Sequence, residues 1–471
     1  MKKTIKISLL LAFLFLGNQL HVLSQSIAPT WYGALRIQGT SLRLVLHVQN
    51  SEGIYSASMD SPDQKAFDIP VTSINIQDSF FKFSIKNLRI EYSGIIQSDS
   101  LIKGTFTQAG QSFAMDLTSN ELNVPKLKRP QEPKEPFGYS QKEVRFFNSQ
   151  DSIYLAGTLT IPKGEGKHPA VVLISGSGPQ NRDEEILGHK PFWVIADFLT
   201  RNGFVVLRFD DRGTEESEGD FYSATSVDFA RDVRAALDFL KTQNEIDTHN
   251  LGLIGHSEGG MIAPMLAAND SNLAFLVLLA GTGLPGKDIL LLQQGLIAKA
   301  NGVSKKDRKA AHKTNKEVFA IMQSSQNTNE IRVQLRKYFD KIIDEKAMEK
   351  LPQGMSKQVY IGLQLSSLTQ PWMLYFLSHD PATVLENVKV PVLALNGSKD
   401  LQVPAKENLK AIKKALNKGG NKRVTTKEFP RLNHLFQTSK TGSPSEYESI
   451  EETFSPEVLE YMLQWMQVNK K

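Results

Sequence analysis

A short Gly-x-Ser-x-Gly sequence carries the residue types needed for nucleophilic catalysis. It consists of Gly255, Ser257 and Gly259, with His256 and Glu258 between them. A strand-like apolar run ends just before it and a helix-forming run follows, which is the strand–turn–helix context that lifts a serine hydroxyl above a sheet edge. Glycines on both sides of such a turn avoid steric clashes. Because a serine hydroxyl is a weak nucleophile without a base, the hypothesis also requires a histidine and a carboxylate.

Asp400 and His434 complete this set best. Asp400 follows the apolar run at 390–395, and His434 follows the strand-like run at 424–429. Ligands of open α/β sheets bind at the carboxyl ends of the strands, and a serine on such a turn is expected in the chain order Ser, acid, His. We therefore predict a triad in which Ser257 attacks, His434 acts as base and then as acid, and Asp400 orients the histidine.

Other acidic residues and histidines fit these roles less well. Asp380 is an alternative to Asp400, but it precedes the strand, and the following Pro381 favours a turn. His256 adjoins the nucleophile and is interpreted as a packing or turn residue, because neighbours at a sharp turn point apart. Three further histidines lie in a polar loop or in a helical region and are interpreted as surface or structural: His249, His312 and His379.

The negative oxygen of a tetrahedral intermediate needs preorganised N–H donors. Glu258, the residue after the nucleophile, is expected to supply one. The loop after the apolar run at 170–174 should supply the other, and it reads Ser-Gly-Ser-Gly-Pro. We take Ser177 as this donor, with Gly176 as the alternative. A phosphate-binding interpretation of the same glycines is weaker, because no Walker Lys-Ser/Thr pair follows.

A second polar loop follows the strand-like run at 204–209, and it reads Asp210, Asp211, Arg212 and Gly213. Two carboxylates could indicate a metal site or a glycosidase pair. Adjacent carboxylates after a strand usually diverge, however, and the arginine can neutralise one of them. We interpret this segment as a structural loop, because buried charges need partners.

Strand-like and helix-like runs alternate through most of the chain after residue 140. The strand-like runs are 144–148, 154–161, 170–174, 204–209, 251–254, 273–280, 390–395 and 424–429, and the helix-like runs are 192–201, 227–241, 261–268, 405–416 and 456–468. This alternation predicts a mostly parallel, doubly wound sheet. From about 284 to 386 the strands stop and helical runs dominate, at 288–300, 305–323 and 330–349. We interpret this block as a helical lid inserted over the active site.

Residues 25–120 have a different period. Apolar and polar residues alternate at 42–48, 80–85 and 88–92, with turn signals between such runs. Short strands at intervals of about 8–12 residues predict a small all-β domain, either a sandwich or a partly closed barrel. No catalytic set is found in it, and His47 is interpreted as a half-exposed strand residue.

Residues 121–137 carry four prolines among charged residues. That composition predicts a stiff, extended linker. It separates the β domain from a second domain expected at 138–471.

The first 24 residues have the pattern of a secretory signal peptide. Lys2, Lys3 and Lys6 precede an almost wholly apolar run at 7–16, and Val22-Leu23-Ser24 offers a cleavage site, which we place after Ser24. A membrane anchor is the alternative, but the apolar run is too short, since about 20 residues are needed to span a bilayer. We therefore expect an exported protein, periplasmic or extracellular.

The overall composition excludes several kinds of chemistry. The 471 residues include no cysteine, which excludes disulfides, Cys-ligated zinc, iron–sulfur clusters and thiol catalysis. The 55 Lys and Arg against 50 Asp and Glu give a surplus too thin to indicate nucleic-acid binding. No apolar run after the signal is long enough to span a membrane, and the predicted chemistry needs no cofactor and no metal.

These segments together resemble the α/β-hydrolase superfamily, and in particular secreted bacterial carboxylesterases with a β-rich N-terminal extension. The resemblance covers about residues 140–471 and implies an α/β-hydrolase fold that cleaves short-chain acyl esters through an acyl-enzyme. Ser175 departs from it, since many relatives have His in a His-Gly oxyanion loop, but the donors there are backbone groups. The matching segments occur in the family's order: 176–183, 210–213, 255–260, 396–400 and 433–436.

Three functional hypotheses remain at this point. The first is a carboxylesterase acting on a small-molecule ester. The second is a serine peptidase, aminopeptidase-like, acting on short or N-blocked peptides or amides, because the same triad serves amide hydrolysis. The third, a non-catalytic exported binding protein, is disfavoured by the intact Ser, Asp and His set. The substrate's acyl and alcohol groups and the oligomeric state are not predicted.

Overall fold

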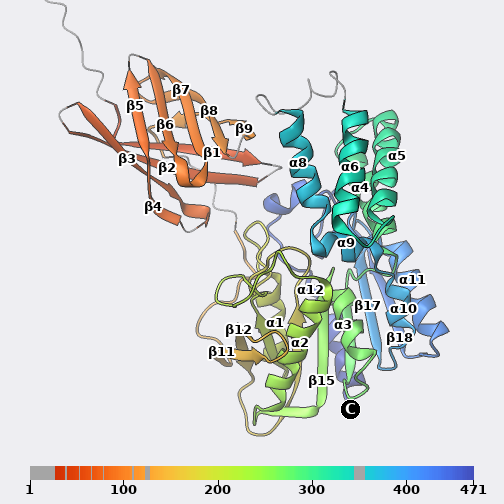
Figure 1. The fold of residues 1–471 in the computed structure, drawn as a ribbon. Coiled ribbons are helices and arrows are strands. Elements are labelled where there is room, and N and C mark those ends of the chain that lie inside the picture. The colour runs from red at the N-terminus through yellow and green to blue at the C-terminus, as the bar shows by residue number, and fades with distance from the viewer. Residues whose placement is uncertain are drawn as a thin grey trace, which may run out of the picture. The chain divides into compact units, whose positions relative to one another are not determined.

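The structure is a computed structural model of the chain (Figure 1). It describes residues 27–37, 40–51, 53–64, 66–77, 79–108, 111–121, 128–343 and 356–471. The described residues form two compact units, one from residue 27 to 121 without 37–40, and one from residue 128 onward. The predicted signal peptide, residues 122–127 of the predicted linker, and the end of the predicted helix at 330–349 lie outside the described residues.

The N-terminal unit is one antiparallel sheet with strand order β4-β3-β2-β1-β10-β8-β7-β6-β5, and β9 pairs with β8. Its strands are β1 (Thr30–Ile37), β2 (Thr40–Ser51), β3 (Ile54–Ser61), β4 (Ala66–Pro70), β5 (Ser73–Gln77), β6 (Phe80–Ile85), β7 (Ile90–Ser98), β8 (Leu101–Gln108), β9 (Gln111–Ala114) and β10 (Leu117–Thr118), with 3-10 turns at Pro62–Gln64 and Lys86–Leu88.

Alternation along the strands explains the core of this unit. In β6, Phe81 and Phe83 are buried while Phe80 and Lys82 are exposed. Successive side chains of a strand point to opposite faces, so one face of the sheet is apolar. The sheet curls until β3 lies against β5, which makes the unit a partly closed barrel rather than two stacked sheets.

The second unit contains an eight-stranded sheet with the order β11-β12-β14-β13-β15-β16-β17-β18. The strands are β11 (Ser140–Asn148), β12 (Ile153–Ile161), β13 (His168–Ile174), β14 (Val205–Phe209), β15 (Ile246–His256), β16 (Phe275–Leu279), β17 (Val392–Gly397) and β18 (Val424–Phe429). β12 pairs antiparallel with both β11 and β14, and every other pairing is parallel. This mostly parallel sheet confirms the fold class expected from the sequence.

Helices cover both faces of this sheet. They are α1 (Pro191–Arg201), α2 (Ser226–Lys241), α3 (Gly259–Ala267), α11 (Ala405–Lys418) and α12 (Pro456–Asn469), and a 3-10 segment spans Pro444–Ser449. Val172 and Ile174 of β13 belong to the apolar cluster that includes residues of α2, α3 and α11. Val171 and Leu173 belong to the cluster on the other face, which includes residues of α1 and α12. The strands are therefore apolar on both faces, which explains their continuous apolar runs.

A helical insertion lies between β16 and β17 in the chain. It comprises α4 (Gly286–Ala300), α5 (Lys305–Met322), α6 (Thr328–Ile342), α8 (Lys357–Leu368), α9 (Pro371–Ser378) and α10 (Pro381–Leu385). The insertion has its own apolar core, which includes Phe319, Leu335 and Leu365. Met261 of α3 shares a second apolar cluster with Ile289 and Phe376, and α10 contacts α3, so the insertion packs on the helix that follows Ser257. The sequence pattern predicted α4, α5 and α6 but not α8, α9 and α10 as separate helices.

Residues 128–137 pack on the rest of the second unit. The Arg129 guanidinium donates to the backbone carbonyls of Gly188 and Ile450, among others. The Gln131 side chain bonds the backbone of Thr453 and Phe454. These contacts fix the second half of the proline-rich segment. Within the described residues, none of the helices combines the length and apolar character required to cross a bilayer.

Candidate active site

Ser257 occupies a strained turn between β15 and α3. Its φ is +51°, a left-handed conformation that non-glycine residues rarely adopt. The turn is held by packing, because a Cβ on Gly255 would lie 2.0 Å from Gly259 O and one on Gly259 would lie 2.1 Å from Ile174 O. The Ser257 N–H donates to Leu279 O at 2.8 Å. Only glycines allow β15, α3 and the end of β13 to approach this closely.

Asp400 and His434 form a buried pair at the ends of β17 and β18. His434 Nδ1 lies 2.8 Å from Asp400 Oδ2, and the two residues are 4% and 3% exposed. The other carboxylate oxygen of Asp400 accepts from the backbone N–H groups of Gln402 and Val403, each at 2.8 Å. An acceptor at Nδ1 places the His434 proton on that nitrogen and leaves Nε2 as the basic one.

The loop that carries His434 lies next to the serine turn. His434 O is 3.0 Å from His256 Nε2, and the two imidazole centroids are 4.8 Å apart. Since His256 immediately precedes Ser257, the fold brings together the strand ends from which Ser257, Asp400 and His434 come.

Asp380 and three further histidines that the sequence offered for these roles have other surroundings. Asp380 is exposed and its side chain caps α10 by accepting from Ala382 N–H. His249 and His312 are exposed. His379 lies in the insertion, where its Nδ1 is 3.2 Å from the Tyr375 hydroxyl oxygen. Within the described residues, no three His, Cys, Asp or Glu side chains converge as metal ligands.

The loop after β13 lies directly against Ser257, since a Cβ on Gly176 would be 3.3 Å from Ser257 Cβ. The Gly176 N–H already donates to Glu184 Oε1 at 2.7 Å. The N–H groups of Ser177 and Glu258 have no acceptor among the described residues. Of the two loop residues considered as oxyanion donors, Ser177 therefore has the unengaged N–H.

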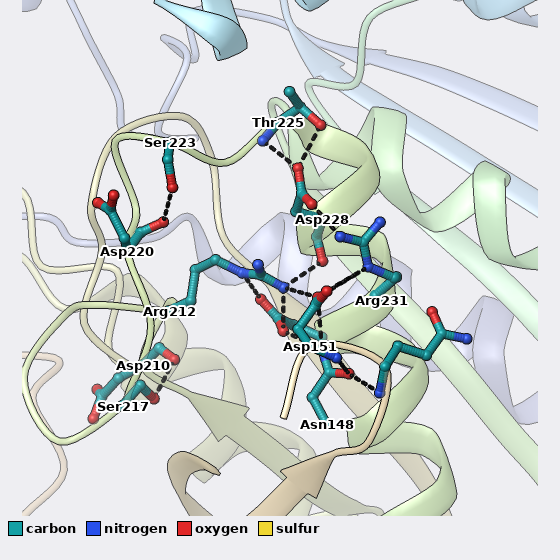
Figure 2. Close-up of polar contacts among 12 residues, drawn as sticks. Asn148, Asp151, Asp210, Arg212, Ser217, Asp220, Ser223, Thr225, Asp228 and Arg231 are labelled. Carbon is teal, nitrogen blue, oxygen red and sulfur yellow. Dashed lines mark hydrogen bonds and ion pairs between the residues drawn. The ribbon is translucent and has the colours of Figure 1, made fainter. Parts of the chain in front are cut away.

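The loop after β14 is fixed by ion pairs, as Figure 2 shows for Arg212. The Arg212 guanidinium donates to Asp151 at 2.7 Å and to both oxygens of buried Asp232. Asp210 accepts from Arg182 in a bidentate pair. Each of these two residues thus has a charged partner, as a buried charge requires.

Asp211, in the same loop, has no guanidinium partner among the described residues. Its Oδ2 accepts from the Gln180 N–H at 3.0 Å. Burial, with smaller contributions from Glu258 and other carboxylates, raises the pKa of Asp211 well above its usual value. Asp211 and Glu258 line one small cavity.

The Glu258 side chain has a role that the sequence did not reveal. Its Oε1 accepts from the Ser226 hydroxyl at 2.5 Å and from Trp372 Nε1 at 2.7 Å, so one carboxylate joins the serine turn, α2 and the insertion helix α9. Its Oε2 is buried and has no partner among the described residues. Burial raises the pKa of Glu258 from 4.5 to about 6, although both hydrogen bonds lower it.

Glu258→Gln should alter the pH dependence of stability. Glu258 binds its proton more tightly in the folded chain than in the unfolded one, so ionisation lowers stability as the pH rises from 4.5 through about 6. A glutamine keeps one acceptor oxygen without this charge. From pH 5 to pH 8 we expect the free energy of unfolding of the wild type to fall by about 1 kcal/mol relative to the variant. Urea unfolding at the two pH values measures this difference.

Glu165→Gln is the matched control, because it removes the same charge from an exposed loop residue. Its unfolding free energy should keep the wild-type pH dependence. Equal pH dependence in Glu258→Gln and the wild type would contradict a buried, protonatable Glu258.

Residues 151–427 match the family described as X-Pro dipeptidyl-peptidase (S15 family). The chain belongs to this family. The match includes Ser257 and Asp400, and His434 follows shortly after its end. The protein is thus a hydrolase of the S15 and esterase group.

Named relatives include both esterases and uncharacterised proteins. Esterase EstD of Thermotoga maritima is 24% identical over 438 residues, which are 93% of this chain and 90% of EstD. An uncharacterised 31.7 kDa protein of Escherichia coli is 25% identical over 269 residues, covering 56% of this chain and 84% of that protein. Among solved structures, an esterase of Pyrococcus furiosus is 17% identical, with a TM-score of 0.43, covering 71% of this chain and 93% of the esterase.

Proposed function

We propose that this protein cleaves carboxylic esters with short acyl groups through an acyl-enzyme on Ser257. The observation that carries the proposal is the buried Asp400–His434 pair on a loop that contacts His256, the residue before a serine held at positive φ. The esterase name of the relative that covers 93% of the chain adds support. The substrate is a small-molecule ester, and the reaction uses protein groups and water.

The proposed reaction has two halves. His434 Nε2 takes the Ser257 proton while Oγ attacks the ester carbonyl, and His434 then protonates the departing alcohol. In the second half His434 deprotonates a water molecule, which attacks the acyl-enzyme, and returns the proton to Ser257. Asp400 holds the imidazole and stabilises its charged form without taking the proton.

The N–H groups of Ser177 and Glu258 are the proposed donors to the oxyanion. Glu258 N–H lies at the start of α3, where the first N–H groups have no partner within the helix. Ser177 N–H is preferred to Gly176 N–H, which the Glu184 carboxylate occupies. Two such donors stabilise the negative oxygen in the transition state.

Replacing triad residues should abolish turnover without unfolding the protein. Ser257→Ala and His434→Ala should each lower kcat on p-nitrophenyl acetate by about 10⁴-fold or more, because nucleophile and base act as one unit. Asp400→Asn should cost roughly 10⁴-fold by favouring the wrong imidazole tautomer. Steady-state rates, with circular dichroism as a check on folding, measure these effects.

A variant of His379 provides the matched control, since this histidine lies in the insertion and contacts Tyr375. His379→Gln should keep a kcat within a few fold of the wild type. Full activity in His434→Ala would contradict the proposed triad.

Peptide hydrolysis is the second candidate, and the family match is the observation that favours it. The same triad can cleave an amide, and a carboxylate near the serine, such as Glu258, could bind a substrate amine. In the structure the Glu258 carboxylate instead accepts from Ser226 and Trp372, which favours the esterase proposal.

A substrate panel separates the two activities. We expect kcat/KM for p-nitrophenyl acetate and butyrate to exceed that for an X-Pro p-nitroanilide by at least about 100-fold, a margin of roughly 3 kcal/mol in transition-state binding. Ser257→Ala measured with both substrate types controls for background hydrolysis. A preference for the anilide would replace the esterase proposal with the peptidase.

We also propose that the protein is exported and cleaved after Ser24, to the periplasm or the medium. The basic and apolar pattern of the first 24 residues supports this. N-terminal sequencing of the protein from the exported fraction should begin at Gln25. An intact Met1 on that protein would contradict cleavage.

A further inference from the structure

One carboxylate and one imidazole connect the three loops around the proposed nucleophile. Glu184 Oε1 lies 2.8 Å from His256 Nδ1 and accepts from the Gly176 N–H at 2.7 Å. On the other side of the ring, His256 Nε2 lies 3.0 Å from His434 O. Glu184 and His256 are 1% and 5% exposed, so these contacts are shielded from water.

The partners of His256 decide how many protons its ring carries. A backbone carbonyl oxygen can only accept a hydrogen bond, and so can an ionised carboxylate. A neutral imidazole has one donor nitrogen and one acceptor nitrogen. Facing an ionised Glu184 and the carbonyl of His434, it could donate to only one of these two acceptors. Both contacts are satisfied with Glu184 ionised when both ring nitrogens carry hydrogen.

His189 is a useful contrast within the same unit. It is 0% exposed, and its Nε2 lies 2.9 Å from Tyr447 O. Its Nδ1, however, lies 3.0 Å from the Thr453 hydroxyl, which can donate, so a neutral ring satisfies both contacts. Burial lowers the pKa of His189 to about 4. For His256 burial also lowers the pKa, but the Glu184 contact outweighs it and the pKa is raised.

We propose that Glu184 and His256 form a buried carboxylate–imidazolium pair that positions the oxyanion loop and His434. The role in catalysis rests on the proposed function. Glu184 takes up the Gly176 N–H and so fixes the backbone that presents Ser177. His256 holds the carbonyl of His434 and therefore the loop that carries the base. Neither side chain touches the reacting atoms, and both are positioning residues.

The pair also places a positive charge beside the base. The His256 and His434 ring centroids are 4.8 Å apart. The charged or titratable groups that act on His256 are Glu184 after β13, Asp400 after β17 and His434 after β18. The His256 ring lies between the Glu184 carboxylate and the His434 ring, so losing His256 alone would leave a carboxylate near the base without its countercharge.

Nuclear magnetic resonance of the wild-type protein with ¹⁵N-labelled histidine tests the charge directly. The His256 signals are identified by their loss in His256→Gln. At pH 7 we expect both ring nitrogens of His256 to be protonated, while His189, assigned with His189→Gln, shows one unprotonated nitrogen. An unprotonated nitrogen on His256 at pH 7, as in a neutral ring facing a protonated Glu184, would overturn the proposal.

The pH dependence of kcat/KM tests the effect on the base. His256→Gln should move the acid limb to higher pH by roughly one unit, because a nearby positive charge is lost and the Glu184 carboxylate is left unpaired. In the double variant Glu184→Gln/His256→Gln the acid limb should return most of the way to its wild-type position, because the unpaired carboxylate is also removed. His189→Gln, a buried histidine outside the site, should leave the limb at its wild-type position.

The outcomes separate this proposal from the proposed function. The charge state is measured without turnover, and the pH profile can use either the ester or the anilide, whichever the protein cleaves. If the acid limb stays at its wild-type position in His256→Gln, the charge of His256 has no effect on the base, and that part of the proposal is contradicted. If His256 is doubly protonated but the protein cleaves neither substrate, the ion pair is supported and the proposed reaction is contradicted.

Discussion

The left-handed turn at Ser257 is the constraint on which the rest of the site depends. A non-glycine residue at positive φ is strained, and here close packing of the backbone compensates for that strain. Gly255 and Gly259 allow the end of β15, the start of α3 and the end of β13 to approach within distances that no Cβ would permit. The same packing brings the loop after β13 against Ser257.

Charge around this turn is arranged so that nearly every buried carboxylate has its own partner. Asp400 is paired with His434, Glu184 with His256, and Asp210 with Arg182. Removing water from unpaired charges would cost several kcal/mol each. Glu258 and Asp211 are the exceptions. The Glu258 carboxylate accepts from the neutral donors of Ser226 and Trp372, and Asp211 accepts from the Gln180 N–H. Burial raises the pKa of both carboxyl groups.

The sequence predicted the parts of the site that depend on strand ends. Ser257, Asp400 and His434 each follow a strand-like run, and parallel strands bring such positions to one edge of the sheet. The contacts of Glu184 and Trp372 could not be predicted in this way, because they depend on how a loop and an insertion helix fold back. His256 was interpreted from the sequence as a packing or turn residue. Its bonds to Glu184 and to the carbonyl of His434 became visible only in three dimensions.

The helical insertion shows the same limit on a larger scale. Its helical character follows from composition and periodicity, but the separation of α8, α9 and α10 depends on short breaks at Thr369–Gln370 and His379–Asp380. The break before α9 sets the position at which Trp372 reaches Glu258. The insertion therefore contributes directly to the polar contacts of the residue that follows the proposed nucleophile.

Covalent labelling shows directly whether Ser257 is the nucleophile. The protein is treated with a fluorophosphonate probe, digested and mapped by mass spectrometry, with Ser257→Ala as the control. We expect one organophosphoryl adduct, on Ser257, that is absent from the variant and formed far more slowly in His434→Ala. No adduct on the folded wild-type protein, or an adduct on a different serine, would contradict Ser257 as the nucleophile.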